Sequence, residues 1–364
     1  MDLLPFFQPD NDTDFPPPTN SDVFDYNWTE EWLLDPPSDN THILPAMRMF
    51  SLTIYTITLL LGATGNGLVI FLTGFHMKKT VTTIWYLNLA VADFIFALCL
   101  STEIAYVSLG YHWTLGRLMC KLNTVVPLLN MFASVFFLTA ISADRYAAVV
   151  HPVWALNHRS LQLASLVAVF IWVAALALSI PYFSFRNTEE LMDGTIHCIY
   201  SFHLQDEGSL RTHRLMVLAE FTLGFLIPFG IILACYCAIM IKLRGKIFGQ
   251  FGRSFKIIVA VVMAFFFCWF PHHLFSILET LEDNSLQMQT TLDIGTPLAE
   301  GLVCLNSCLN PILYVFVGSD YKKTSRRSLF LAFKGAVNDK WAFTPSFPTN
   351  RTSSSTSGVE SNMV

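Results

Sequence analysis

Charged residues are scarce in this chain of 364 residues, because Asp, Glu, Lys and Arg together make up only 13% of it. A soluble globular protein carries about 25% of these residues. Cysteine is also sparse, since eight scattered residues are too few for a disulfide-rich scaffold. The chain is instead 53% hydrophobic, and its apolar residues lie in long runs with the charges between them. This pattern excludes an ordinary soluble enzyme, a disordered chain and a nucleic-acid-binding protein, and it predicts an integral membrane protein.

Seven apolar segments are long enough to cross a membrane, which takes about 20 helical residues. They cover approximately residues 49–75, 81–109, 118–149, 162–184, 213–242, 254–281 and 290–317. We therefore predict an all-α membrane protein, with a seven-transmembrane helix bundle over residues 48–318.

Basic residues predict how this bundle is oriented. Most Lys and Arg residues lie in four segments, near 76–80, 145–160 and 242–256 and after residue 318. All four lie on one side of the membrane if the N-terminus lies on the other side. Because loops rich in Lys and Arg stay in the cytoplasm, we expect a multi-pass plasma-membrane protein with an extracellular N-terminus and a cytoplasmic C-terminus.

The first 47 residues contain ten acidic residues and no Lys or Arg. This composition predicts a disordered acidic extracellular tail over 1–47. No cleavable signal peptide is visible there, so we expect the first span to direct insertion into the membrane. Asn11 and Asn27 each begin an Asn-X-Thr acceptor sequence, and both are predicted glycosylation sites.

A carboxylate in the second span, Asp93, lies at a depth where ionisable groups are expensive and are therefore candidates for function. Amides and hydroxyls occur at a comparable depth in neighbouring spans. One carboxylate with such oxygen ligands suits a small hard cation. The alternative is a neutral aspartic acid whose hydrogen bonds hold the bundle together. The proposed cation ligands are Asp93, Asn130, Ser134, Asn306 and Asn310.

The third span ends in Asp144-Arg145-Tyr146. Adjacent opposite charges at a helix end could simply anchor the helix at the membrane surface. The alternative is a two-state latch in which Arg145 pairs with Asp144 at rest and with another partner in the active state. The sixth and seventh spans contain Pro271 and Pro311, which remove backbone hydrogen bonds and predict bends that can act as hinges.

Two cysteines, Cys120 and Cys198, lie outside the membrane in the predicted orientation. Because that compartment is oxidising, we predict a disulfide between them. The sequence contains no HExxH, Walker or GxSxG motif and no Cys/His set with the spacing of metal ligands. We therefore predict no catalytic residues, no enzymatic activity and no cofactor apart from the cation.

The chain resembles rhodopsin-like (class A) G-protein-coupled receptors over residues 43–340. The resemblance rests on four features in the order that this family has them: Asp93, Asp144-Arg145-Tyr146, Pro271 and Asn310-Pro311. His151-Pro152-Val153-Trp154 and Ile180-Pro181-Tyr182-Phe183 are similar to the chemoattractant group of that family. Within the group the chain is most similar to the chemerin (chemokine-like) receptors, and it also resembles the type-2 prostaglandin D2 and formyl-peptide receptors.

The resemblance implies coupling to an inhibitory heterotrimeric G protein, phosphorylation by receptor kinases and recruitment of arrestin. It implies a short cytoplasmic eighth helix over 319–340, where a basic amphipathic stretch suits contact with membrane lipid, and a Ser/Thr-rich cytoplasmic tail over 341–364. It identifies the cation as an allosteric sodium ion. The implied activation switch consists of Asp144, Arg145, Tyr146, Tyr236, Trp269, Pro271, Asn310, Pro311 and Tyr314.

The predicted ligand site departs from these relatives at Glu220, where they carry a basic residue. Glu103 and Glu300 are expected to face the same outer cavity, which would then attract positive charge. We predict a peptide or protein ligand, chemerin-like, with a basic residue. The predicted ligand-binding residues are Glu103, Asn130, Arg186, Arg214, Glu220, His272, His273 and Glu300.

Other interpretations remain open at this point. The glutamates could pair with Arg186 or Arg214 and be merely structural. The chain could be a lipid-mediator receptor of the prostaglandin D2 type, or a non-signalling decoy of the same fold. A transporter is disfavoured, because no paired hydrophobic repeats are visible.

Overall fold

A computed structural model describes residues 43–200, 207–242, 253–281 and 285–317. The predicted glycosylation sites Asn11 and Asn27, the predicted eighth helix 319–340 and the tail 341–364 lie outside these residues. Internal contacts divide the chain into Met1–Pro45 and Ala46–Val364. Apart from the first three residues of its first helix, the bundle described below belongs to the second unit.

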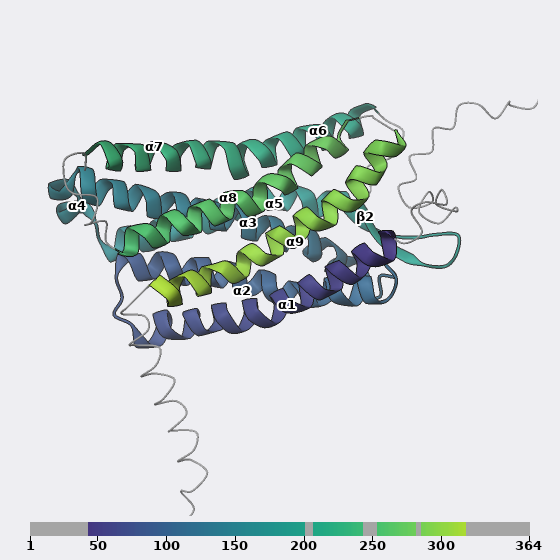
Figure 1. Ribbon diagram of the computed structural model, residues 1–364, viewed down its shortest axis with the longest axis horizontal. Coiled ribbons are helices and arrows are strands. Elements are labelled where there is room, and N and C mark those ends of the chain that lie inside the picture. The colour runs from purple at the N-terminus through teal and green to yellow at the C-terminus, as the bar shows by residue number, and fades with distance from the viewer. Residues whose placement is uncertain (1–42, 201–206, 243–252, 282–284, 318–364) are drawn as a thin grey trace, which may run out of the picture. The chain divides into compact units, whose positions relative to one another are not determined.

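Long helices account for nearly all of the described chain (Figure 1). The first three are α1 (Ile43–Phe71), which continues as the π-helical turn η1 (Leu72–His76), then α2 (Val81–Ser108) and α3 (Gly116–Val150). The short α4 (Pro152–His158) precedes α5 (Leu161–Phe185). The remaining helices are α6 (Glu207–Phe221), the π-helical turn η2 (Thr222–Leu226), α7 (Ile227–Lys242), α8 (Arg253–Glu279) and α9 (Leu286–Val317).

The helices agree with the seven predicted spans to within a few residues, except at the starts of the first and fifth spans, where α1 and α6 each begin six residues earlier than predicted. Because α1 begins at Ile43, residues 43–47 are helical, and their assignment to the disordered tail was wrong. Six stretches in the described ranges are long and apolar enough to cross a membrane, and α9 is not among these six. This helix contains Asp293, Glu300 and two prolines within its 32 residues.

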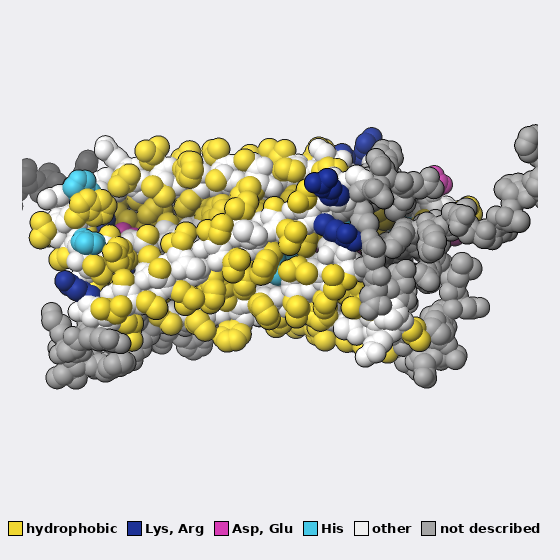
Figure 2. Space-filling model, turned by 90° about the horizontal axis from the view of Figure 1, so that it is seen from above, with side chains coloured by type: hydrophobic (Ala, Val, Ile, Leu, Met, Phe, Trp, Pro, Cys, Tyr) yellow, Lys and Arg dark blue, Asp and Glu magenta, His cyan; other side chains and the backbone are white. Residues whose placement is uncertain are grey.

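The surface of the bundle is apolar where lipid would cover it. Leu60, Phe170 and Phe267 expose 61%, 70% and 70% of their surface. Large apolar side chains exposed in such number are unfavourable in water and normal in a bilayer. Figure 2 shows hydrophobic side chains over the middle of the face that it draws, with Lys and Arg side chains nearer its ends.

The centre of the bundle is α3, which packs against α2, α5 and α7. Its side chains Met131, Phe132 and Phe137 are almost completely buried. In lipid such contacts stabilise through close packing rather than through exclusion of water. Gly224 in η2 permits a close approach, because a Cβ atom there would lie 2.8 Å from Met131 Cε.

A two-stranded antiparallel hairpin, β1 (Arg186–Glu190) and β2 (Ile196–Tyr200), follows α5. The predicted disulfide between Cys120 and Cys198 is confirmed, and it ties β2 to the first turns of α3. We call the end of the bundle beside these strands the hairpin end, and the opposite end the α4 end (Figure 1). The predicted site residues lie toward the hairpin end, at the α4 end and in the middle of the bundle.

Candidate functional site

A buried polar cluster lies in the middle of the bundle, between α2, α3 and α9. Asn310 Nδ2 donates to Asp93 Oδ2 at 2.6 Å, and the Asn130 amide lies 3.2 Å from both Asp93 Oδ1 and Ser134 Oγ. Asn306 is buried one turn before Asn310. The structure thus brings Asp93, Asn130, Ser134 and Asn310 together, and it places Asn306 in the same helix as Asn310.

The Asn130 amide takes part in the hydrogen bonding around Asp93. With its nitrogen toward the carboxylate, it donates to Asp93 Oδ1 and to Ser134 Oγ, both at 3.2 Å. The carboxylate, the amide oxygens and the Ser134 hydroxyl are ligand types that suit a sodium ion.

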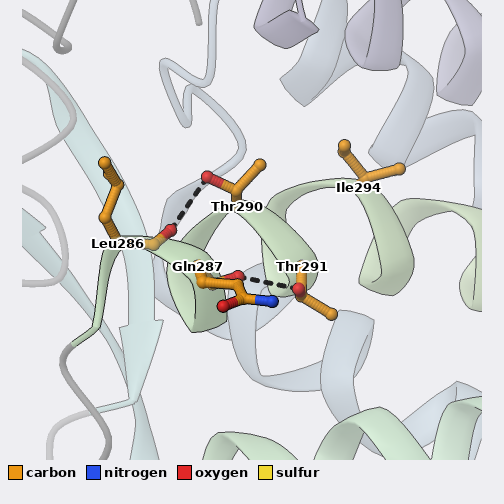
Figure 3. A pocket seen from close by; sticks show the side chains of 5 residues that line it. All are labelled: Leu286, Gln287, Thr290, Thr291 and Ile294. Carbon is orange, nitrogen blue, oxygen red and sulfur yellow. Dashed lines mark hydrogen bonds between the residues drawn. The ribbon is translucent and has the colours of Figure 1, made fainter.

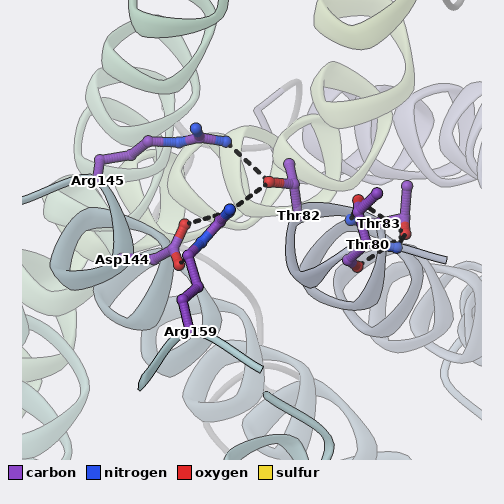
Figure 4. Close-up of polar contacts among 6 residues, drawn as sticks. All are labelled: Thr80, Thr82, Thr83, Asp144, Arg145 and Arg159. Carbon is purple, nitrogen blue, oxygen red and sulfur yellow. Dashed lines mark hydrogen bonds and ion pairs between the residues drawn. The ribbon is translucent and has the colours of Figure 1, made fainter. Parts of the chain in front are cut away.

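The predicted activation switch has a different ion pair at the α4 end (Figure 4). Arg159, which lies between α4 and α5, makes a bidentate pair with Asp144, at 2.7 and 3.0 Å. Arg145 instead donates from Nη2 to Thr82 Oγ1 at 3.0 Å. The expected pair between Arg145 and Asp144 is thus replaced here by one between Arg159 and Asp144. The hydrogen bonds with Asp144 raise the pKa of the Arg159 guanidinium above its ordinary value.

The other residues of the predicted switch lie along α3, α7 and α8. Trp269 is buried and packs against Phe265, with ring centroids 5.8 Å apart, on the helix that contains Pro271. Tyr236 is partly buried and packs against the core. Tyr146 OH lies 3.4 Å from His151 Nε2.

Bends were predicted at Pro271 and Pro311. Helix α8 continues through Pro271, and helix α9 continues through Pro311. The side chain of Tyr314 lies outside the described part of the structure.

Glu220 is held in a buried cluster that joins α5, α6 and α8, toward the hairpin end. Tyr182 OH donates to Glu220 Oε2 at 3.3 Å. His272 Nε2 lies 3.5 Å from Glu220 Oε1, and His273 Nδ1 lies 4.0 Å from the same oxygen. We call these four residues the Glu220 cluster. Glu220 therefore already has one partner that can carry positive charge, His272, and this partner is not an arginine.

The carboxylates of Glu103 and Glu300 have different surroundings. Glu103 accepts a short hydrogen bond from Asn123 Nδ2, and Glu300 accepts one from Tyr55 OH at 3.1 Å. Both donors are neutral. The two glutamates interact electrostatically with each other, and Glu300 also interacts with Glu279. We call Glu103, Glu279 and Glu300 the acidic cluster.

The predicted arginine partner Arg186 interacts electrostatically with Glu103 but lies beyond ion-pair distance. Among the described side chains, no Lys or Arg nitrogen lies within 4.0 Å of a carboxylate oxygen of this cluster. Arg186 lies over the Tyr200 ring, 4.4 Å from its centroid. Arg214 lies in α6, and Asn130 lies deeper, in the polar cluster around Asp93.

Two residues of these clusters are absent from the sequence prediction. Glu279 lies seven residues after His272, so helical periodicity places both on one face of α8. That spacing could have identified Glu279. The role of Tyr182 as partner of Glu220 has no sequence signal, because it depends on how α5 packs against α6.

A shallow hollow of about 490 Å³ lies along the first turns of α9 (Figure 3). The Thr290 and Thr291 hydroxyls in it donate to carbonyl oxygens of their own helix, at 2.9 and 2.7 Å. Its lining residues are Leu286, Gln287, Thr290, Thr291 and Ile294. None of them is a predicted ligand residue, so the hollow is separate from both clusters.

Comparison with known proteins identifies the family. The family described as "7 transmembrane receptor (rhodopsin family)" matches residues 65–314. The chain belongs to this receptor family. Helix α9 is therefore the seventh transmembrane helix of the receptor, and the resemblance found in the sequence is confirmed.

Individual relatives agree with this assignment. The chain is 41% identical over 321 residues to the C3a anaphylatoxin chemotactic receptor of Danio rerio, which covers 88% of this chain and 86% of the relative. It is 43% identical over 289 residues to Chemerin-like receptor 1 of Homo sapiens, with 76% and 77% covered. It is 40% identical over 313 residues to Chemerin-like receptor 2 of Rattus norvegicus, with 86% and 88% covered.

The receptor is thus a multi-pass membrane protein of the chemoattractant type, and its family is one of receptors and not of enzymes. Membership implies an extracellular ligand, a G-protein partner and a place in the plasma membrane.

Proposed function

We propose that this receptor recognises a peptide or protein ligand with a basic residue, and that it signals through an inhibitory G protein and arrestin. The ligand binds at the hairpin end, which faces the outside if the N-terminus is extracellular. Receptor kinases phosphorylate the cytoplasmic tail 341–364 before arrestin binds. The names of the relatives, which refer to chemerin and to the anaphylatoxin C3a, support a ligand of this class.

The acidic cluster is the observation that carries this proposal. Glu103 and Glu300 accept hydrogen bonds from neutral donors, Asn123 and Tyr55. Arg186 interacts electrostatically with Glu103, and His272 with Glu300, but among the described residues neither makes an ion pair within 4.0 Å with these two carboxylates. Carboxylates that share a partly buried site repel each other, and a cation between them relieves that repulsion. A basic ligand side chain therefore gains more here than at Glu220, where His272 already supplies opposite charge at 3.5 Å.

Activation follows from differential binding. The agonist binds more tightly to the state in which α8 bends at Pro271 and its end nearest the G protein moves outward, so its binding shifts the population toward that state. Asp93, Asn130, Ser134, Asn306 and Asn310 would hold sodium, whose positive charge neutralises the carboxylate when it is bound. Their contacts across α2, α3 and α9 then favour the inactive arrangement.

Inhibition of cyclic-AMP formation in transfected cells tests the proposal. A chemerin C-terminal peptide, C3a, a panel of basic peptides and prostaglandin D2 are applied, with Arg145→Ala as the signalling-deficient control. We expect a response to at least one basic peptide or protein that the control variant loses. A response to prostaglandin D2 alone would identify a lipid-mediator receptor. Ligand binding without any G-protein response would identify a decoy.

A further inference from the structure

Two arginines share one hydroxyl at the α4 end of the bundle (Figure 4). Arg145 and Arg159 each donate from Nη2 to Thr82 Oγ1, at 3.0 and 3.1 Å. Two guanidinium groups on one oxygen atom repel each other. Their approach therefore depends on a negative charge close by.

Asp144 supplies that charge, and it directs both carboxylate oxygens to Arg159. The distances are 2.7 Å from Arg159 Nε to Oδ1 and 3.0 Å from Nη2 to Oδ2. The side chain of Asp144 is only 9% exposed, so water screens this pair weakly. A guanidinium fork that matches a carboxylate in this way makes a short, charge-assisted pair. Arg145 is the next residue in the chain, yet it points to Thr82 instead.

The shared acceptor is held rigidly at the start of α2. Thr80 caps this helix, since its Oγ1 accepts from Thr83 N at 3.1 Å while Thr80 N donates to Thr83 Oγ1 at 2.7 Å. Thr82 lies within this closed turn. A helix N-terminus carries partial positive charge, which disfavours two cations beside it. The arrangement of the two arginines is thus stable only while Asp144 is ionised and paired.

We propose that Arg159 is a positioning residue for G-protein coupling, because it holds the Asp144 carboxylate away from Arg145. Arg145 is then restrained by neutral hydroxyl groups, those of Thr82 and Tyr86, and it is released easily when a G protein docks at this end. Without Arg159, the carboxylate turns to the neighbouring Arg145 and forms the resting pair. The inference rests on the G-protein coupling of the family and not on the inhibitory subtype proposed above.

The size of the effect follows from the nature of the competing pair. A G protein that binds Arg159→Ala must first break an ion pair between Asp144 and Arg145 at a partly exposed site. Such a pair contributes enough to lower the affinity about three- to tenfold. Arg159→Lys keeps the charge but loses the planar fork, so we expect a shift in the same direction and smaller.

The experiment measures binding of nucleotide-free heterotrimeric G proteins, one from each class, to the purified full-length receptor in lipid nanodiscs without agonist. The variants are Arg159→Ala, Arg159→Lys, Asp144→Asn and the double variant Asp144→Asn/Arg159→Ala. Lys79→Ala removes one exposed positive charge three residues before Thr82 and is the matched control for net charge. Thermal unfolding of each purified variant shows that the comparison is made between folded receptors.

We expect the Kd of Arg159→Ala to rise about three- to tenfold and that of Lys79→Ala to stay at the wild-type value. In the Asp144→Asn background, Arg159→Ala should change nothing further, because the amide cannot attract Arg145. A merely structural role of Arg159 would lower affinity in both backgrounds and overturn the proposal. So would unchanged or tighter binding of Arg159→Ala, or a failure of the wild-type receptor to bind any class. Binding only to a class other than the inhibitory one would refute the proposed subtype and leave this inference intact.

Discussion

Glu300→Gln isolates the charge of the acidic cluster from its packing. Gln has the same length as Glu and keeps an oxygen that can accept from Tyr55 OH, which lies 3.1 Å from the carboxylate. The contact between α1 and α9 is therefore retained. The variant changes the attraction for a cationic ligand and leaves the helices where they are.

The expected loss can be worked out from Coulomb's law. A ligand cation about 4 Å from this carboxylate gains about 4 kcal/mol at an effective dielectric constant of about 20. Desolvation of both groups reduces the net value to about 1.5–3 kcal/mol, as for other hydrogen bonds to charged groups. This free energy corresponds to a potency about 10- to 150-fold lower. Glu220→Gln should cause a smaller loss, because His272 already opposes that charge.

The assay is a dose–response curve for inhibition of cyclic-AMP formation, with the basic peptide agonist and with its citrulline analogue, which lacks the charge. Only the response to the basic peptide should depend on Glu300. Asp293→Asn is the matched control, since it removes a carboxylate two turns earlier in α9. Equal losses for both peptides would show that Glu300 acts through structure. Unchanged potency of the basic peptide would remove Glu300 from the ligand site.

Three other variants probe separate parts of the bundle. Asp93→Asn is expected to abolish the weakening of agonist binding by NaCl, measured by radioligand competition with and without the salt; a sodium effect that survives in the variant contradicts the cation site. Cys198→Ser breaks the bond to Cys120 and is expected to lower the free energy of unfolding by about 2–4 kcal/mol, read from thermal unfolding of the purified receptor, where an unchanged midpoint would refute it. Gly295→Ala places a Cβ atom 2.1 Å from Phe275 ring atoms and should destabilise the receptor by about 1–3 kcal/mol. Gly230→Ala is its control, because a Cβ atom there has no neighbouring atom within 4 Å. Combining Gly295→Ala with Phe275→Leu should restore stability.

The transmembrane helices were predictable because a bilayer restricts the backbone conformations that can cross it. Backbone N–H and C=O groups without water must form hydrogen bonds within their own helix, so an apolar run of sufficient length indicates a transmembrane helix. The span predicted at 162–184 is observed as Leu161–Phe185. The disulfide was predictable for a similar reason, because Cys120 and Cys198 were the cysteines placed outside the membrane.

The partners of the charged side chains were not predictable in the same way. Arg145 is adjacent to Asp144 in sequence, whereas Arg159 reaches it only because the chain returns after α4. Glu220 likewise meets His272 through the packing of α6 against α8. An ion pair depends on directions in space, and spacing along one helix carries no information about a side chain on another helix.

The π-helical turn η2 (Thr222–Leu226) has a consequence for the alignment of the receptor with its relatives. A π turn contains one residue more than an α turn, and each residue of an α-helix advances it by about 100°. Counting along a regular helix from Tyr236 back to Glu220 would therefore point Glu220 about 100° away from its observed direction. Deleting one residue from η2 would have the same effect in the molecule: the side chains before it would rotate away from His272, and those after it would keep their places. In this receptor, the number of residues between Glu220 and Tyr236 sets the position of Glu220 along the fifth span, and the π turn η2 sets the direction in which its side chain points.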